Sequence, residues 1–172
     1  MLMPMLGSSE SLLNADNKKI YYEGMPMHKG ARLRRHGDMF ERTAGGFYKS
    51  HGRIDDTMNL GGIKTSSVEI ERVCNKASEH IIETAAVAVP PDGGGPDQLV
   101  VFVVLSDSAG PQLTVEYLKM AFTQALQTGL NPYFKVGLVM VVAEFPRTAT
   151  NKVLRRVLKS QAMNAQKLRS KL

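Results

Sequence analysis

The sequence is poor in several residue types: it has one cysteine, no tryptophan, and only 6% aromatic residues among its 172 positions. A single cysteine, Cys74, cannot form an internal disulfide or supply several thiolate ligands to zinc. The longest unbroken apolar run, residues 99–105, is far too short to cross a bilayer as a helix. The first residues lack the basic segment and long apolar stretch of a secretory signal. These absences predict a soluble protein of a reducing, intracellular compartment, without a membrane span.

The residues that are present describe an ordinary globular chain with a basic surplus. Hydrophobic residues make up 43% and charged residues 22% of the sequence, which argues against disorder. The length suits one domain, or a small domain with a piece of another. Lys and Arg total 22 against 16 Asp and Glu, giving a net charge of +6. This surplus is compatible with nucleotides, nucleic acid or a phosphate-bearing coenzyme, and selects none of them.

The two halves of the chain differ in the pattern of strands and helices that they predict. Up to about residue 55, short strands are expected at 19–22 and 32–43. The second run passes through Gly45-Gly46 into residues 47–50, which is typical of a β-hairpin. A lone hairpin buries little surface and is marginal in water. This half therefore looks like the end of something larger.

From Met58 onward, strand-like and helix-like segments alternate. Ser66 and Glu69 have the spacing of a capping box, which predicts a helix from about 67 to 77. Further strands are expected at 84–89, 98–105 and 134–142, and further helices from Thr114 to about Gly129 and from about Lys152. This order predicts a small α+β domain with its own modest core.

Several local patterns carry little functional weight. The run from Gly61 to Thr65 resembles a P-loop only in part, because Ile63 separates its glycines from Lys64. The four histidines are too scattered to predict a metal site. Cys74 lies within the expected helix with no base placed by the sequence, so a packed thiol is the better interpretation.

Three stretches are more specific when they are taken together. They are Arg34-Arg35-His36-Gly37-Asp38, the segment from Gly52 to Glu71, and the segment from Pro146 to Arg156. In this order and spacing they resemble the closing signatures of the adenylate-forming acyl-activating enzymes, which include acyl-CoA synthetases, peptide-synthetase adenylation domains and luciferases. The resemblance covers residues 21–158 and is strongest to plant-type peroxisomal acyl-activating enzymes.

The resemblance implies a domain organisation. Residues 56–172 would be the mobile C-terminal domain, an α+β fold with a short antiparallel or mixed sheet flanked by helices. Residues 1–55 would be the hairpin-rich tail of the large N-terminal AMP-binding domain, and Asp55 would be the hinge. A hinge must absorb a large change in backbone angles, which Asp tolerates better than most residues.

The resemblance also implies nucleotide-binding residues. Asp38 matches the carboxylate that binds both ribose hydroxyls, and an ionised carboxylate can accept both O–H groups at once. The alternative for Asp38 is a hairpin-turn residue. Arg53 matches an arginine that contacts the ribose. Lys64 stands where relatives often carry a phosphate-contacting arginine, and it keeps the charge without the planar fork.

The remaining implied roles concern the acyl transfer. Lys152 matches the catalytic lysine that bridges the carboxylate substrate and the α-phosphate during adenylation. Asn151 replaces the usual preceding glycine and tolerates the left-handed backbone better than most residues. Gly61 and Gly62 would line the CoA channel, since a missing Cβ lets a thin ligand arm pass. Arg155 and Arg156 could hold CoA phosphates, although a solvated basic helix face is favoured for them.

The chain ends in Ser170-Lys171-Leu172, a peroxisomal address that an import receptor reads at a free C-terminus. The Ser/Thr/Gly-rich ATP phosphate loop of the family and the acyl pocket are absent from this sequence. The chain alone is therefore expected to be inactive. It would need the missing N-terminal domain, with ATP and CoA as substrates and Mg²⁺ arriving with ATP.

Two other function classes remain open on the sequence. The chain could be a non-catalytic binding or regulatory module that pairs with a separate N-terminal domain. It could also be a basic nucleic-acid binder that uses its last helix, which the motif set disfavours.

Overall fold

The computed structural model describes residues 10–53, 56–91 and 93–169. The chain divides into two compact units, Met1–Asp55 and Asp56–Leu172. This division falls between the same two residues as the expected domain boundary. None of the helices in the described ranges is long and apolar enough to span a membrane.

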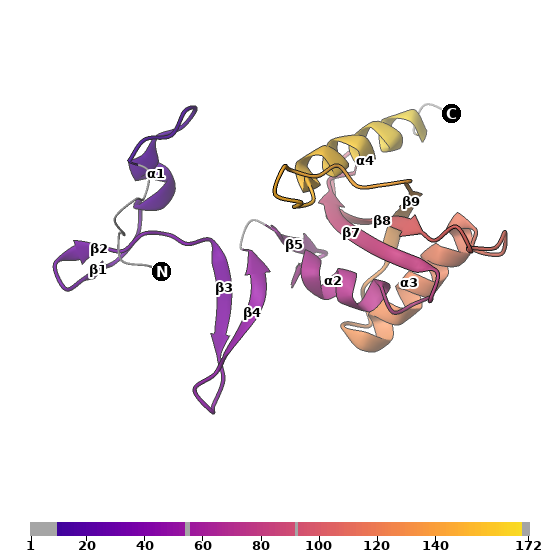
Figure 1. The fold of residues 1–172 in the computed structure, drawn as a ribbon, viewed down its shortest axis with the longest axis horizontal. Helices are drawn as coiled ribbons and strands as arrows, with labels where there is room; N and C mark the ends of the chain where they lie inside the picture. Colours follow the sequence, from indigo (N-terminus) through magenta and orange to yellow (C-terminus); the bar gives the residue numbers. More distant parts are fainter. Residues whose placement is uncertain (1–9, 54–55, 92, 170–172) are drawn as a thin grey trace. The chain divides into compact units, whose positions relative to one another are not determined.

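The first unit begins with a short helix, α1 (Asn17–Tyr21), followed by two hairpins (Figure 1). The side chain of Asp16 accepts hydrogen bonds from the backbone N–H groups of Lys18 and Lys19 at 2.8 and 3.2 Å. The strand expected at 19–22 is therefore wrong. The N-cap at Asp16 satisfies the first free N–H groups of a helical turn, and this local bond outweighs the β-propensity of the run.

The hairpins of the first unit are antiparallel. Strands β1 (Met27–His28) and β2 (Ala31–Arg32) form the smaller one. Strands β3 (Asp38–Arg42) and β4 (Tyr48–Arg53) form the larger one, which turns at the glycine pair. Gly46 has a φ of 79°, a backbone angle that glycine adopts freely. The hairpin predicted from the Gly-Gly turn is confirmed.

The second unit starts with the hairpin of β5 (Thr57–Leu60) and β6 (Ile63–Ser66), followed by α2 (Ser67–Cys74). Ser66 accepts a hydrogen bond from the Glu69 backbone N–H, and the Glu69 carboxylate accepts one from the Ser66 backbone N–H. The predicted capping box is therefore confirmed. The helix ends three residues earlier than expected.

A three-stranded mixed sheet forms the centre of the second unit, in the order β7 (Ile81–Val89), β8 (Gln98–Leu105), β9 (Val136–Val141). Strand β8 pairs antiparallel with β7 and parallel with β9. Helix α3 (Val115–Gly129) provides the crossover that a parallel pair requires. The apolar runs of β7 and β8 are buried on both faces because helices cover both sides of the sheet.

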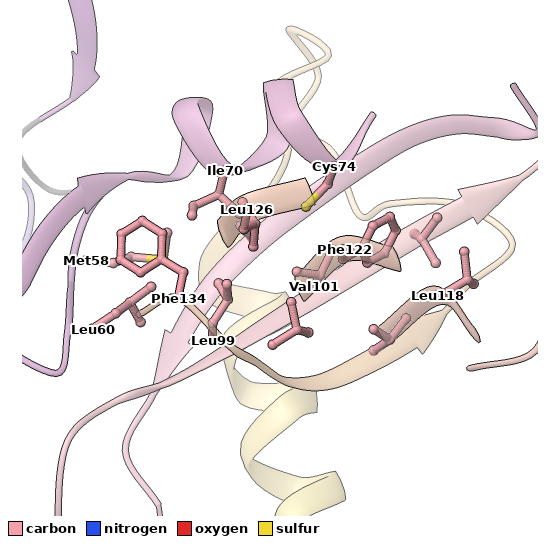
Figure 2. Packing of buried hydrophobic residues seen from close by; sticks show 14 of the residues in the cluster. Met58, Leu60, Ile70, Cys74, Leu99, Val101, Leu118, Phe122, Leu126 and Phe134 are labelled. Carbon is pink, nitrogen blue, oxygen red and sulfur yellow. The ribbon is translucent and has the colours of Figure 1, made fainter. Parts of the chain in front are cut away.

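Two apolar layers hold the helices to the sheet. On one face, Ile70 and Cys74 of α2 meet Leu118, Phe122 and Leu126 of α3 over the strands (Figure 2). On the other face, α4 (Arg155–Arg169) packs through the buried residues Leu158 and Ala162. The expected α+β class, with a short mixed sheet flanked by helices, is confirmed.

Candidate functional site

A narrow loop connects β9 to α4, and we call residues 146–154 the lysine loop. Its two sides pair through an antiparallel bridge between Arg147 and Val153. The backbone N–H of Leu154 donates to the carbonyl of Pro146 at 2.8 Å, which closes the base of the loop. The backbone of the loop is thus held by its own hydrogen bonds.

Lys152 lies near the tip of the lysine loop with an exposed side chain. Its carbonyl accepts from the Thr148 backbone N–H at 2.9 Å, and its own N–H donates to the Thr148 hydroxyl at 3.1 Å. Asn151 has a φ of 63°, the left-handed conformation that Asn tolerates better than most residues. Helix α4 begins three residues later than expected, because Lys152 belongs to this bonded loop.

An arginine anchors each side of the lysine loop to the rest of the second unit. On the first side, Arg147 forms an ion pair with Glu83 of β7 and donates to the Asn151 carbonyl at 3.1 Å. On the second side, Nη2 of Arg155 donates to both carboxylate oxygens of Glu71, at 2.8 and 2.9 Å. The loop is therefore fixed to a strand of the sheet at one end and to α2 at the other.

Glu71 is the most enclosed carboxylate of this arrangement, with a side chain that is only 14% exposed. Its Oε1 also accepts a hydrogen bond from the backbone N–H of Ala86 at 2.9 Å. Burial raises the pKa of Glu71 above its usual value, and this effect outweighs the lowering by Arg155 and by the Ala86 N–H. A second carboxylate oxygen, Oδ2 of Asp56, lies 3.7 Å from Nη1 of Arg155.

These contacts correct the interpretation of Arg155. Its side chain is 27% exposed and engaged with two carboxylates, so it is neither a solvated basic face nor free for CoA phosphates. Arg156, its neighbour, is exposed. The difference arises because successive helix positions point about 100° apart.

The β5–β6 hairpin presents the other predicted residues of the second unit. Gly61 and Gly62 form its two-residue turn with φ angles of 63° and 91°. The side-chain oxygen of Asn59 accepts a hydrogen bond from the Gly62 N–H at 2.9 Å. A Cβ added at either glycine would meet no atom within 4 Å, so the turn is open. Lys64 is exposed, directly opposite Asn59.

The first unit brings the two predicted ribose residues together. Asp38 lies opposite Arg53 in the β3–β4 register. The Asp38 carboxylate is 2.9 Å from Nδ1 of His36 and is partly exposed. Just before it, the Arg34 guanidinium lies over the Tyr21 ring, 3.7 Å from its centroid. This cation–π contact ties the Arg34–Asp38 stretch to α1.

Some of the predicted residues lie outside the described part of the chain. Asp55 and the terminal Ser170, Lys171 and Leu172 lie outside the described residues, as does the side chain of Arg53. Within the described ranges, no three His, Cys, Asp or Glu residues are grouped so that they could hold a metal ion.

The sequence did not single out the acidic anchors Glu71 and Glu83. A signal for Glu71 exists, since Ser67, Ile70 and Cys74 form the buried stripe of α2 and Glu71 falls at the same helical spacing. A carboxylate on a buried stripe needs a partner. The partner, 84 positions away, is not marked by any local pattern.

Comparison with known proteins gives relatives along most of the chain. Probable acyl-activating enzyme 18, peroxisomal, from Arabidopsis thaliana is 58% identical over 156 residues, which cover 91% of this chain and 21% of that protein. Hexanoyl-CoA synthase from Cannabis sativa is 54% identical over 157 residues, covering 91% and 22% respectively. No protein-family model matches the chain.

The chain belongs to the adenylate-forming acyl-activating family. Among solved structures, the anthranilate CoA ligase AuaEII in complex with anthranoyl-AMP is similar, with a TM-score of 0.64 and 29% identity over 84% of this chain and 26% of that one. ATP-bound MatB from Rhodopseudomonas palustris shares the fold, with a TM-score of 0.66 at 20% identity, covering 81% of this chain and 26% of that one. This member of the family spans about a fifth of the length of its curated relatives.

Proposed function

We propose that this chain supplies the catalytic lysine and the CoA-channel turn of an AMP-forming acyl-CoA synthetase. In the first step a carboxylate attacks the α-phosphate of ATP, giving an acyl-adenylate and pyrophosphate. In the second step the thiol of CoA displaces AMP and leaves a thioester. The observation that carries this proposal is an exposed Lys152 on a loop held by ordered contacts, in a sequence 58% identical to an acyl-activating enzyme.

Lys152 would act in the first step. Negative charge builds up around the α-phosphate as the carboxylate attacks, and an ammonium group stabilises it. At about 4 Å and an effective dielectric near 20, one such charge pair contributes about 4 kcal/mol. Roughly three powers of ten in rate follow if this stabilisation is confined to the transition state.

The other residues would hold the substrates. Asp38 and Arg53 would bind the ribose, and Lys64 would approach phosphate in the adenylation state. The open turn at Gly61 and Gly62 would leave room for the pantetheine arm of CoA. Mg²⁺ would be carried by the phosphates of ATP.

The proposed partner is a large AMP-binding domain, of which the first unit would be the tail. Several large apolar side chains of this unit are exposed: Leu13, Met27, Phe40, Phe47 and Tyr48. Exposed apolar groups gathered in one small unit are typical of a surface that another part of a protein covers. The large domain could be joined covalently or supplied in trans, and the second case is the regulatory-module alternative.

The test is a chimera in which this chain replaces the matching segment of the Cannabis sativa hexanoyl-CoA synthase. Hexanoate-dependent pyrophosphate release and hexanoyl-CoA formation are measured separately. Lys152→Ala is expected to lower pyrophosphate release about a thousandfold, by loss of the charge described above. Lys159→Ala, which removes an exposed lysine of α4, is the matched control and is expected to have no effect.

Two results would contradict the proposal. One is a Lys152→Ala chimera that releases pyrophosphate as fast as its parent. The other is ready acyl-adenylate formation by the 172-residue chain alone, which lacks the phosphate loop. Restoration of activity by a separately added large domain would support the regulatory-module alternative instead.

A peroxisomal location is part of the same proposal. Acyl-activating enzymes 17 and 18 of Arabidopsis thaliana are both named peroxisomal. The tripeptide Ser170-Lys171-Leu172 would serve as the signal for the import receptor. A fluorescent protein fused before this chain should enter peroxisomes, and deletion of the tripeptide should leave it in the cytosol. Unchanged import after the deletion would exclude this signal.

A further inference from the structure

We propose that Glu71 is a positioning residue for Lys152, acting through Arg155. This inference rests on the proposed role of Lys152 in adenylation, and it assigns a function to a carboxylate that does not itself touch substrate.

The contacts of Glu71 leave it little freedom. Both of its carboxylate oxygens accept from Nη2 of Arg155, and Oε1 also accepts from the backbone N–H of Ala86 in β7. Its side chain is largely buried, so these bonds face little competition from water. Glu71 is therefore a fixed point that joins α2, the sheet and the first residue of α4.

Arg155 links Glu71 to the lysine loop. It follows Lys152 by three residues, and its backbone N–H donates to the Val153 carbonyl at 3.1 Å. Val153 in turn is the bridge partner of Arg147 across the loop. A shift of Arg155 would therefore move the strand of the loop that carries Lys152.

The other contacts of the Arg155 guanidinium are weaker than its two hydrogen bonds to Glu71. Asp56 is at 3.7 Å, beyond good hydrogen-bond distance, and the buried Nε has no hydrogen-bond partner in the described part of the chain. Helix α4 itself is held separately, by Leu158 and Ala162 against the sheet. Loss of the Glu71 carboxylate should thus loosen the loop while the helix stays in place.

The decisive variant is Glu71→Gln in the chimera, because it keeps the side-chain shape and removes the charge. A displacement of about 1 Å at a catalytic group can cost on the order of a hundredfold in rate. We expect a loss of about this size in kcat for pyrophosphate release, with the KM for ATP unchanged. Glu116→Gln, the same change at an exposed position of α3, is the control and should change nothing.

A double variant separates positioning from a general structural effect. If Glu71 acts through Lys152, then Glu71→Gln should have no further effect on pyrophosphate release in a Lys152→Ala background. A full additional loss in that background would overturn the inference, as would unchanged kcat in the single variant. If Lys152→Ala alone has no effect, the proposed function itself fails, so the two failures are distinguishable.

Amide hydrogen exchange on the 172-residue chain gives a second measurement that does not need activity. Glu71→Gln should speed the exchange of the backbone amides of Asn151, Lys152 and Leu154, which donate hydrogen bonds within the loop. The amides that form the hydrogen bonds between β7 and β8 should keep their exchange rates. A uniform increase over the whole second unit would mean general destabilisation and would contradict a positioning role. No increase in the loop would contradict it as well.

Discussion

The two units of this chain keep their order by different means. Every buried hydrophobic residue in the described ranges lies at Met58 or beyond, so the apolar core formed by these residues belongs to the second unit. In the first unit, the only buried residue among the described side chains is Asn17. The first unit is held instead by local contacts: the cap at Asp16, the strand pairing of two hairpins and the contact of Arg34 with Tyr21.

Only one of the two units can be expected to fold by itself. A buried Leu, Val or Phe side chain contributes about 1.5–3 kcal/mol, and the second unit has many of them on both faces of one sheet. A helix cap contributes about 1 kcal/mol, and a two-stranded hairpin is marginal alone. The described residues of the first unit therefore lack the buried contacts of an independent domain, while the second unit has them.

Separating the two units should have opposite consequences for their folding. Residues 56–172 produced alone should keep a cooperative thermal unfolding transition, because they retain both apolar layers of the sheet. Residues 1–55 produced alone should show the circular dichroism of an unfolded chain. Loss of the transition in the fragment 56–172, or a cooperative transition in the fragment 1–55, would contradict this assignment of stability to the second unit.

Truncation of one phenylalanine in each unit should affect stability very differently. Phe122→Ala empties the centre of the α2–α3 layer, where the side chain is fully buried, and should lower the free energy of unfolding by about 3–5 kcal/mol (Figure 2). Phe47→Ala removes a side chain that is 77% exposed and should change the free energy of unfolding by less than about 0.5 kcal/mol. Urea unfolding of both variants measures the difference, and equal losses would contradict the burial argument.

The fold of the second unit was largely predictable because its signals are local. The capping box at Ser66 and the apolar runs of β7 and β8 predicted the correct element types. The first unit was harder, since the run 19–22 favours a strand until the acceptor at Asp16 is considered. A short segment without a core follows its caps rather than its propensities.

The candidate site was predictable only where the resemblance named a residue. Lys152, Gly61 and Gly62 lie on exposed turns of the second unit, where a substrate could contact them. The ion pair that anchors one side of the lysine loop was not predictable, because Glu71 and Arg155 are 84 positions apart and meet only through the fold. Charge pairing across such a distance has no periodic signature in sequence.

Thiol labelling offers a third comparison of the units. Burial raises the pKa of Cys74 from 9.0 to about 12, which leaves about a thousandfold less thiolate near pH 8. Alkylation by iodoacetamide should therefore be slow and should follow the unfolding of the second unit. Ala44→Cys adds a thiol at an exposed turn of the first unit and should react at once. Equal rates at the two sites, resolved by mass spectrometry, would contradict the buried placement of Cys74.

The smallest expected effect concerns a loop of the second unit that, like the first unit, depends on local backbone geometry. Asn151 has a φ of 63°, and Asn151→Ala should cost about 1 kcal/mol, because alanine keeps the Cβ that crowds the following carbonyl but loses the short polar side chain with which Asn tolerates this conformation. Both sides of the lysine loop are anchored, so the strain should appear in the unfolding of the whole unit. Asn151→Gly, which introduces a residue without a Cβ, should leave stability within about 0.5 kcal/mol. If the alanine and glycine variants melt alike, the left-handed residue contributes nothing to how Lys152 is held.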